Sequence, residues 1–411
     1  MIRIAAFVAC FAISAAASAQ DDSSSYNKDY QREAHEIFQD VIAMRTAAGH
    51  GQVPRMAAYL AQRFLEVGFD EEDVVLIPQT LSTGEAAASL VVRFRGNGLS
   101  GQKPVLFLAH MDVVDAIPSD WERDPFTLIE EDGFFFGRGT LDNKMGITTL
   151  TTTFLRLKRE GFEPTRDLIL AFTGDEETGM ETTRALVTTH RNLTDAEYVL
   201  NADAGGGYQD HDHKPVAYLL QAAEKTYVSF ELTIRNPGGH SSVPRVDNAI
   251  YELATVLKNI EAHRFPGRIN DITQGYFEKL SRVVPGPAGD AMAAYAKDPT
   301  DEAARSVLER IPAQVGVTRT TCVATMLRAG HAENALPQSA TATVNCRVFP
   351  GVSVDDIRQT LLEVGGNPAL EIETLGEPLE SPVSPLREEV TALVGEATRD
   401  NYADVPIIPY M

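Results

Sequence analysis

The chain has 411 residues, of which 44% are hydrophobic and 23% are charged. This is the composition of a globular protein, and the length allows two domains. The net charge of −22 argues against nucleic acid and against anionic membrane surfaces as partners, and we attribute this charge to solubility.

The first 19 residues have the pattern of a secretory signal peptide. Arg3 precedes a short apolar run, which ends in the small residues Ala17, Ser18 and Ala19. We therefore predict cleavage after Ala19 and a periplasmic or secreted mature protein. The alternative is a membrane anchor, but this run is shorter than a bilayer span requires, and no other segment is long and apolar enough.

Strands and helices alternate through the first half of the mature chain. Amphipathic helices are expected near 30–48 and 54–67, and a third over 145–160. Short apolar runs indicate buried strands at 89–96, 104–110, 168–174 and 198–203. This alternation predicts an α/β fold, in which helices cover both faces of a mostly parallel sheet.

After about residue 224 the pattern changes to that of an inserted α+β domain with an antiparallel sheet. We expect an alternating strand at 226–236 and helical stretches at 246–262, 287–310 and 353–363. Two further strands are expected around Cys322 and Cys346. A helix near 386–400 and a buried strand at 405–411 follow the insert. We therefore predict a first domain in two parts, 20–224 and 382–411, and an inserted domain over 225–381.

Two cysteines remain in the mature chain, because Cys10 lies in the signal peptide. In an oxidising compartment Cys322 and Cys346 could form a disulfide bond. Two isolated thiols in the core are an equally good explanation.

Acidic residues and one histidine follow the ends of the predicted strands or precede the helix at 145–160. In open α/β sheets, ligands bind beyond the carboxyl ends of the strands. Several such residues at one edge of a sheet imply a shared cation. The residues are His110, Asp112, Asp142, Asp175, Glu176, Glu177 and Asp203.

One imidazole with several carboxylates and no thiolate is a donor set that suits Zn²⁺, and after it Mn²⁺ or Co²⁺. The excess of carboxylates favours two ions that one carboxylate bridges. Of Glu176 and Glu177, one is expected to bind metal and the other to deprotonate water as a general base. Asp112 lies on the same face of an extended strand as His110 and can hold the second nitrogen of the ring. Asp175 is expected to shape the turn.

Each of these patterns has a simpler explanation when it stands alone. A His-x-Asp pair is common, three acids in a row often begin a solvated helix, Asp142 could cap a helix, and Asp203 could lie in a loop. We favour the metal site because the patterns occur together at strand ends. Serine-hydrolase, HExxH and phosphate-loop motifs are absent from the sequence. His211 and His213 are expected to lie in a surface loop.

The sequence resembles the M20 metallopeptidases, which include glutamate carboxypeptidase, aminoacylase, carnosinase-like dipeptidases and carboxypeptidase S. The resemblance extends over about residues 104–351, and the helical insert near 270–315 is most similar to the carboxypeptidase S branch. The segments that carry it are FLAHMDVV, WERDPF, FFGRGTLDNKMG, AFTGDEETG, NADAGG, GGHSSVP and ENALPQSATATVNCRVFPG.

The resemblance implies two zinc ions per subunit, with Asp142 bridging them and a cis peptide bond between Asp142 and Asn143. His110 and Asp203 would complete the first zinc site, and Glu177 would bind the second ion. Glu176 would be the general base, and Asp112 would orient His110.

The resemblance also implies that the inserted domain is a lid that carries a homodimer interface. His240 would stabilise the oxyanion in the site of a partner subunit. Asn334 and Arg347 would hold the substrate, with the guanidinium of Arg347 gripping a free carboxylate at two points. Without the resemblance, His240 would be interpreted as a loop histidine and Arg347 as a salt-bridge residue on a strand.

The family supplies one further zinc ligand, a histidine that follows a strand like 405–411, and none of the nine histidines here matches it. We therefore expect this chain to be a fragment or truncated. The expected activity is hydrolysis of an amide bond next to a free C-terminal carboxylate in a peptide or N-acyl amino acid. The alternatives are an N-acyl amino acid deacylase of the aminoacylase type, and an inactive chain that serves only as a dimeric module.

Overall fold

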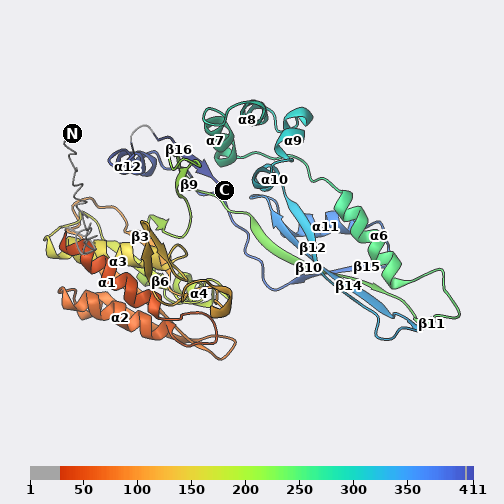
Figure 1. The fold of residues 1–411 in the computed structure, drawn as a ribbon, viewed down its shortest axis with the longest axis horizontal. Coiled ribbons are helices and arrows are strands. Elements are labelled where there is room, and N and C mark those ends of the chain that lie inside the picture. The colour runs from red at the N-terminus through yellow and green to blue at the C-terminus, as the bar shows by residue number, and fades with distance from the viewer. Residues whose placement is uncertain (1–27, 403–404) are drawn as a thin grey trace, which may run out of the picture. The chain divides into compact units, whose positions relative to one another are not determined.

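The computed structural model describes residues 28–402 and 405–411 (Figure 1). The predicted signal peptide lies outside the described residues. The chain divides into two compact units between Asp203 and Ala204. Within the described ranges, no helix has both the length and the apolar character needed to cross a membrane.

A five-stranded sheet forms the centre of the first unit. In sheet order its strands are β1 (Val74–Thr80), β2 (Ala86–Phe94), β6 (Leu168–Thr173), β3 (Val105–His110) and β7 (Tyr198–Asn201). β3 is parallel to β6 and to β7, whereas β2 is antiparallel to both of its neighbours. Four of the five strands therefore point in one direction, which confirms the predicted mostly parallel sheet.

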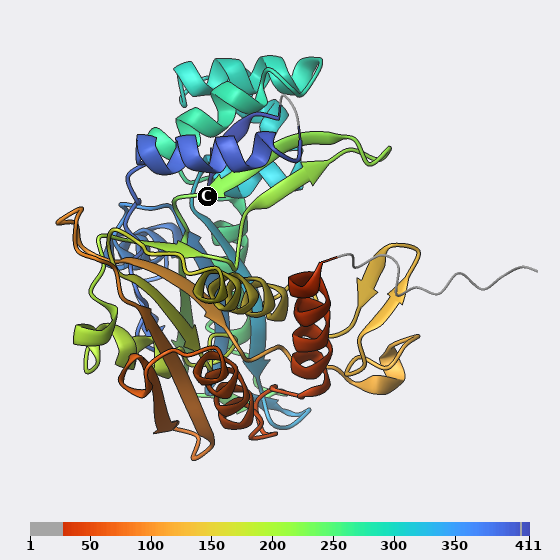
Figure 2. The same ribbon diagram turned by 90° about the vertical axis from the view of Figure 1, so that its left-hand side faces the viewer.

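Helices cover both faces of this sheet. Successive side chains of a strand point to opposite faces, so each strand contributes side chains to two cores. Leu90 and Phe172 pack into one core with α1, α2 and α3, while Val91 and Ile169 pack with α4 on the other face. Figure 2 shows the sheet of this unit with its helices. The remaining elements of the unit are α1 (Asp29–Ala43), α2 (Val53–Glu66), η2 (Glu71–Asp73), η3 (Pro118–Asp120), β4 (Ile129–Glu131), β5 (Phe134–Phe136), α3 (Lys144–Arg159), α4 (Glu181–Val187) and α5 (Arg191–Thr194).

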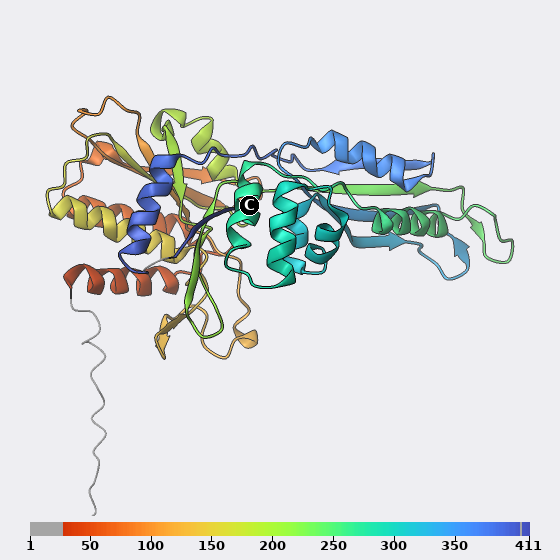
Figure 3. The ribbon, with the colours of Figure 1, turned by 90° about the horizontal axis from the view of Figure 1, so that it is seen from above.

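The second unit contains a four-stranded antiparallel sheet, in the order β12 (Thr321–Ala329), β14 (Ser339–Val348), β10 (Thr226–Arg235) and β15 (Leu370–Leu375). One face of it packs into a core with α6 (Ala249–Ala262) and α11 (Val354–Gly365), which run beside the strands in Figure 3. The side chains of Tyr227, Val323 and Arg347, which belong to the other face, are exposed. This one-sided burial explains the alternating polarity of the 226–236 segment.

The helices α7 (Asp271–Leu280), α8 (Pro287–Lys297) and α9 (Glu302–Leu308) pack with a smaller sheet. In this sheet β9 (Pro215–Gln221) is parallel to β16 (Ile407–Tyr410) and antiparallel to β8 (Gly206–Gln209). The predicted helical stretch at 287–310 is two helices, because Pro299 interrupts it and the Asp301 side chain caps the second one. The remaining elements of the unit are β11 (Gly239–His240), α10 (Pro312–Thr318), β13 (Ala335–Leu336) and α12 (Glu388–Arg399). The sequence-based domain boundaries, including the assignment of 382–411 to the first domain, stay a prediction.

Cys322 and Cys346 form a disulfide bond across neighbouring strands. They lie directly opposite each other on β12 and β14, with their Cα atoms 4.1 Å apart. Of the two explanations that the sequence left open, the disulfide is the one that the structure contains.

Candidate metal centre

The first unit brings six of the predicted site residues together at one edge of its sheet. β3, β6 and β7 are parallel, so their carboxyl ends lie at the same edge. His110 is the last residue of β3, the two glutamates closely follow β6, Asp203 follows β7, and Asp142 precedes α3. The loops after parallel strands thus supply almost all of the polar groups.

Two triads of possible metal ligands share the imidazole of His110. One triad contains Asp142 and Glu177, the other contains Glu176 and Asp203, and in each the donor atoms lie within 4.8 Å of one another. Nε2 of His110 is 2.8 Å from Oδ1 of Asp142 and 3.3 Å from Oδ1 of Asp203. Imidazole with carboxylates is a donor set that fits zinc and similar divalent ions. Glu176, which the resemblance implies as the general base, also lies among the possible ligands.

Asp112 is buried and holds both the imidazole and the loop after β6. Nδ1 of His110 lies 3.0 Å from the backbone carbonyl oxygen of Asp112 and 3.5 Å from its Oδ1. The carboxylate also accepts hydrogen bonds from the backbone N–H groups of Glu176, at 3.0 Å, and Glu177, at 2.9 Å. The sequence predicted the contact of Asp112 with the imidazole of His110, but not its hydrogen bonds to the loop after β6.

The carboxylates give the site a strongly negative potential. Burial by itself would lower the pKa of His110, but hydrogen bonds to Asp112 and Asp203, together with their charges, outweigh burial and raise this pKa to about 11. Burial raises the pKa of the Glu176 carboxyl to about 7; the charge of Asp203 adds to this shift and His110 opposes it. A bound cation stabilises a group of carboxylates of this kind.

Asn143 contacts one of the possible ligands, which the sequence did not predict. The Asp142–Asn143 peptide bond is cis, as the resemblance implied. Asn143 is fully buried, and its Nδ2 donates a hydrogen bond to Oδ1 of Asp203 at 3.3 Å. A Cβ atom on Gly146 would lie 2.0 Å from Oδ1 of Asn143, so the glycine leaves room for this side chain. A glycine three residues after Asn143, at the start of the predicted helix, was the available signal.

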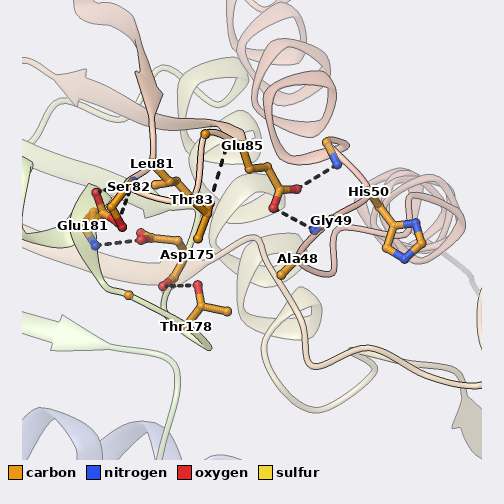
Figure 4. Close-up of a pocket in the computed structure, with 13 residues that line it drawn as sticks. Ala48, Gly49, His50, Leu81, Ser82, Thr83, Glu85, Asp175, Thr178 and Glu181 are labelled. Carbon is orange, nitrogen blue, oxygen red and sulfur yellow. Dashed lines mark hydrogen bonds between the residues drawn. The ribbon is translucent and has the colours of Figure 1, made fainter. Parts of the chain in front are cut away.

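Asp175 supports the loop that carries the two glutamates. Its carboxylate accepts hydrogen bonds from the backbone N–H groups of Glu181, at 2.7 Å, and Thr182, at 2.9 Å, at the beginning of α4. Together with loops 48–51 and 81–85 it lines an open cavity of about 1020 Å³ (Figure 4). These bonds are those of a residue that shapes a turn, which is the role expected from the sequence.

The second unit holds His240 and Asn334 close together but keeps Arg347 apart from them. β11, which contains His240, pairs with β13, and the backbone N–H of Ser241 donates to the carbonyl oxygen of Asn334 at 2.9 Å. These residues lie near the end of β14 that begins at Ser339. Arg347 is eight residues further along this strand, which is roughly 27 Å at about 3.4 Å per residue.

His211 and His213 lie exposed in the turn between β8 and β9. In the part of the chain that the structure describes, neither belongs to a triad of possible metal ligands. The prediction of a surface loop is confirmed.

The sequence matches the profile of Peptidase family M20/M25/M40 over residues 106–409. It is 31% identical over 288 residues to the N-fatty-acyl-amino acid synthase/hydrolase PM20D1 of Xenopus tropicalis. This alignment covers 69% of this chain and 56% of that protein. It is 28% identical over 334 residues to the probable carboxypeptidase S-like 2 of Dictyostelium discoideum, in an alignment that covers 78% of this chain and 62% of that protein. The chain therefore spans less than two thirds of the length of these curated relatives.

Solved structures share the fold. The M20 family metallo-carboxypeptidase Sso-CP2 from Sulfolobus solfataricus superimposes with a TM-score of 0.65 at 18% identity, over 92% of this chain and 86% of that one. The family match extends over more than half of the chain. It includes the six residues that lie together at the candidate metal centre, namely His110, Asp112, Asp142, Glu176, Glu177 and Asp203. This chain therefore belongs to peptidase family M20/M25/M40.

Proposed function

We propose that this protein is a dizinc hydrolase that cleaves an amide bond next to a free carboxylate, in a peptide or in an N-acyl amino acid. The observation that supports this most directly is the pair of carboxylate triads that share His110. The names of the two relatives, one a carboxypeptidase S-like protein and the other an N-fatty-acyl-amino acid synthase/hydrolase, support the same range of substrates.

His110, Asp142, Glu177 and Asp203 would hold the two ions. Zinc ions bound there would lower the pKa of a water molecule and stabilise negative charge on the carbonyl oxygen of the substrate. The negative potential of the site and its lack of thiolates support a hard or borderline divalent cation, with Mn²⁺ or Co²⁺ as substitutes.

Glu176 is the proposed general base. Its carboxyl group is half-buried, and its backbone N–H is fixed by Asp112. It would take a proton from water as the water oxygen attacks the carbonyl carbon of the amide. It would then deliver this proton to the amide nitrogen as the C–N bond breaks. The products are a carboxylic acid and a free amine, with one water consumed.

We further propose a homodimer in which both subunits contribute to one site. His240 and Asn334 lie at one end of β14 and Arg347 lies near the other, so a single copy of the second unit does not present all three to one substrate. The partner subunit's His240 would donate a hydrogen bond to the carbonyl oxygen as this oxygen becomes negative. Arg347 would bind the free carboxylate through two parallel N–H···O bonds.

The proposed location is the periplasm or the extracellular medium. The Cys322–Cys346 disulfide supports it, because disulfide bonds persist in oxidising compartments. Nucleic acids and membranes are not proposed as partners of so acidic a chain.

The alternative to a peptidase is an N-acyl amino acid deacylase, which the PM20D1 relative favours. Both reactions leave an amino acid whose carboxylate Arg347 could bind. Measuring kcat/KM for dipeptides, N-acetyl amino acids and N-fatty-acyl amino acids in parallel distinguishes the two.

The central test combines metal content with the Glu176→Gln variant. Elemental analysis should give about the same zinc content for the variant and the wild type. The variant's kcat should fall by about 10²-fold or more, since general base catalysis typically contributes 10²–10⁴-fold. Glu181→Gln is the matched control: this glutamate begins α4, just after the same loop, and binds Ser82, and its loss should leave kcat unchanged.

Two outcomes would refute parts of this proposal. An active Glu176→Gln variant would remove the assignment of the base. A wild-type protein that binds no zinc and hydrolyses none of these amides would favour the inactive dimeric module.

A further inference from the structure

Lys144 is fully buried, although lysine is almost never fully buried without an acidic partner. It is the first residue of α3 and lies two residues after Asp142. Among the described residues, no carboxylate pairs with its ammonium group, which donates a hydrogen bond at 2.6 Å to the backbone carbonyl oxygen of Met44. Because methionine would fill the same space without a buried charge, stability alone does not explain a lysine at this position.

The fold makes room for this side chain and places its charge at the end of a helix. A Cβ atom on Gly139 would lie 2.9 Å from Cδ of Lys144, so the glycine leaves space for the lysine. Met44 is the C-cap residue of α1, which has no basic residue in its own last turn. The C-terminal end of a helix carries partial negative charge, which a cation stabilises. The lysine therefore links the beginning of α3 to the end of α1.

The segment that follows α1 has a second buried contact with the candidate metal centre. The hydroxyl group of Thr46, which is buried, donates a hydrogen bond at 2.7 Å to the backbone carbonyl oxygen of Met111. Met111 is fully buried and directly follows His110. The three consecutive residues 44–46 thus contact both the strand end that carries His110 and the beginning of the helix that follows Asp142.

Asp142 needs support from its neighbours, because packing does not fix its own side chain. This side chain is exposed, and so is that of Leu141 before it. Asn143 and Lys144, which come after it, are fully buried. The backbone N–H of Lys144 also donates to the carbonyl oxygen of Gly139 at 3.0 Å, which closes the loop. The position of the Asp142 carboxylate therefore depends on the buried residues that follow it.

We propose that Lys144 and Thr46 are positioning residues, which act through residues 44–46 to hold Asp142 next to His110. Both side chains bond to backbone carbonyl groups, so neither is itself a metal ligand or a catalytic residue. Ligands that are already held in place bind a metal ion more tightly than ligands that binding must order. A buried charge that lowers stability is accepted where it serves a functional site. This inference rests on the metal ions of the proposed function, and not on its reaction.

The first test replaces the lysine by an uncharged residue of similar length. Lys144→Met should bind zinc at least about tenfold more weakly than the wild type, as expected when a group that orients a metal ligand is lost. Competition with a chelator measures this affinity. Lys158→Met is the matched control, because it makes the same change near the other end of α3, and it should retain the wild-type affinity. Affinities of the two variants that agree within about twofold would overturn the proposal.

Denaturant unfolding of the metal-free protein separates positioning from general stabilisation. The unfolding midpoint of Lys144→Met should not fall, because the loss of one hydrogen bond is offset by the removal of a buried charge. A lysine that merely stabilises the fold would instead lower the midpoint and leave the zinc affinity unchanged. If both the midpoint and the affinity fall, or if this variant does not fold, Thr46→Val decides.

Thr46→Val keeps the shape of the side chain and removes only its hydroxyl group. It should also weaken zinc binding by about tenfold. Thr151→Val is the matched control, because Thr151 is equally buried in α3 and its hydroxyl has no partner among the described residues. Equal zinc affinities of Thr46→Val and Thr151→Val would overturn the proposal.

The double variant tests whether the two side chains act through one segment. If they do, Lys144→Met combined with Thr46→Val should bind zinc about as weakly as either single variant, since the second change removes a link that is already broken. Independent contributions would multiply to about a hundredfold loss, and that result would overturn the coupling of Lys144 with Thr46.

Hydrogen exchange of the metal-free protein keeps this inference separate from the proposed function. In Thr46→Val the backbone N–H of Lys144 should exchange at least about tenfold faster than in the wild type, although the lost hydroxyl bonds to Met111 and not to this loop. Thr151→Val should exchange there as the wild type does. A chain that shows this response and binds no zinc would support the positioning role while the proposed function fails. Unchanged exchange at Lys144 would overturn the role whether or not zinc binds.

Discussion

At the scale of single residues, the carboxylate of Asp112 connects the strand that carries His110 with the loop that carries Glu176 and Glu177. Its two oxygens each accept one backbone N–H from that loop. A buried carboxylate with both oxygens satisfied in this way fixes backbone as well as side-chain positions. The geometry of the candidate metal centre therefore depends on a residue that does not itself belong to either triad.

We expect Asp112→Asn to weaken zinc binding by about 10- to 100-fold, the usual effect of removing a group that orients a metal ligand. The new amide keeps the shape, but its NH₂ group would face a backbone N–H that then has no acceptor, at a cost of about 1–3 kcal/mol in the free energy of unfolding. Competition with a chelator measures the affinity, and denaturant unfolding of the metal-free protein measures the stability.

Asp115→Asn provides the control for this prediction. Asp115 is exposed and binds Arg45 at 2.8 Å, so its variant should retain the zinc affinity of the wild type. If Asp112→Asn binds zinc as tightly as Asp115→Asn, the carboxylate of Asp112 does not organise the site.

The sequence predicts which residues of the candidate metal centre come together, because the carboxyl ends of parallel strands in one sheet share an edge. It does not predict their individual contacts, since these depend on side-chain directions within loops. Glu176 accordingly lies with Asp203 in one triad, and Asn143 contacts Asp203, although neither contact is visible in the spacing. The separation of Arg347 from His240 follows from the length of β14, which the sequence pattern does not define.

At the scale of elements, β1 shows why some strands escape prediction. Its sequence VVLIPQT contains Pro78, which interrupts a strand-like run. The strand nevertheless forms, because it lies at the edge of the sheet with β2 as its neighbour there. A proline lacks the N–H that a central strand would need, and an edge strand tolerates this loss.

The pairing of the cysteines depends on strand register, which the sequence pattern does not reveal. From Met326 to Ala329, β12 pairs with β14 in a register that would place Cys322 opposite Arg347. An irregularity between Ala324 and Met326 shifts the register by one residue. Cys322 therefore faces Cys346, and the disulfide becomes possible.

Reduction of this disulfide should lower the free energy of unfolding by about 3 kcal/mol, because the bond closes a loop with a sequence separation of 24 residues. Denaturant unfolding with and without reductant measures the difference. A variant with both Cys322→Ala and Cys346→Ala should show no response to the reductant. Equal unfolding midpoints for the oxidised and reduced wild type would contradict the expected stabilisation.

At the scale of the whole molecule, we propose β12 as the element that joins the two copies of the proposed dimer. It lies at the edge of its sheet, and Val323, Met326 and Leu327 on it are 59%, 52% and 63% exposed. An apolar edge strand is a template for pairing with another chain. Each copy carries a net charge of −22, so association must overcome repulsion that salt screens. The proposed dimer should therefore tighten as ionic strength rises.

Leu327→Lys should convert the dimer into monomers, because it places a charge in the apolar edge that the two copies would share. Analytical ultracentrifugation should show a fall from twice the subunit mass to the subunit mass. Val199→Lys, at a residue of β7 that is 52% exposed, should leave the mass unchanged. Since the partner subunit's His240 is proposed to complete the site, monomers should keep their zinc but lose turnover. A Leu327→Lys protein that remains dimeric would exclude β12 from the interface, and a fully active monomer would remove His240 of the partner subunit from the reaction.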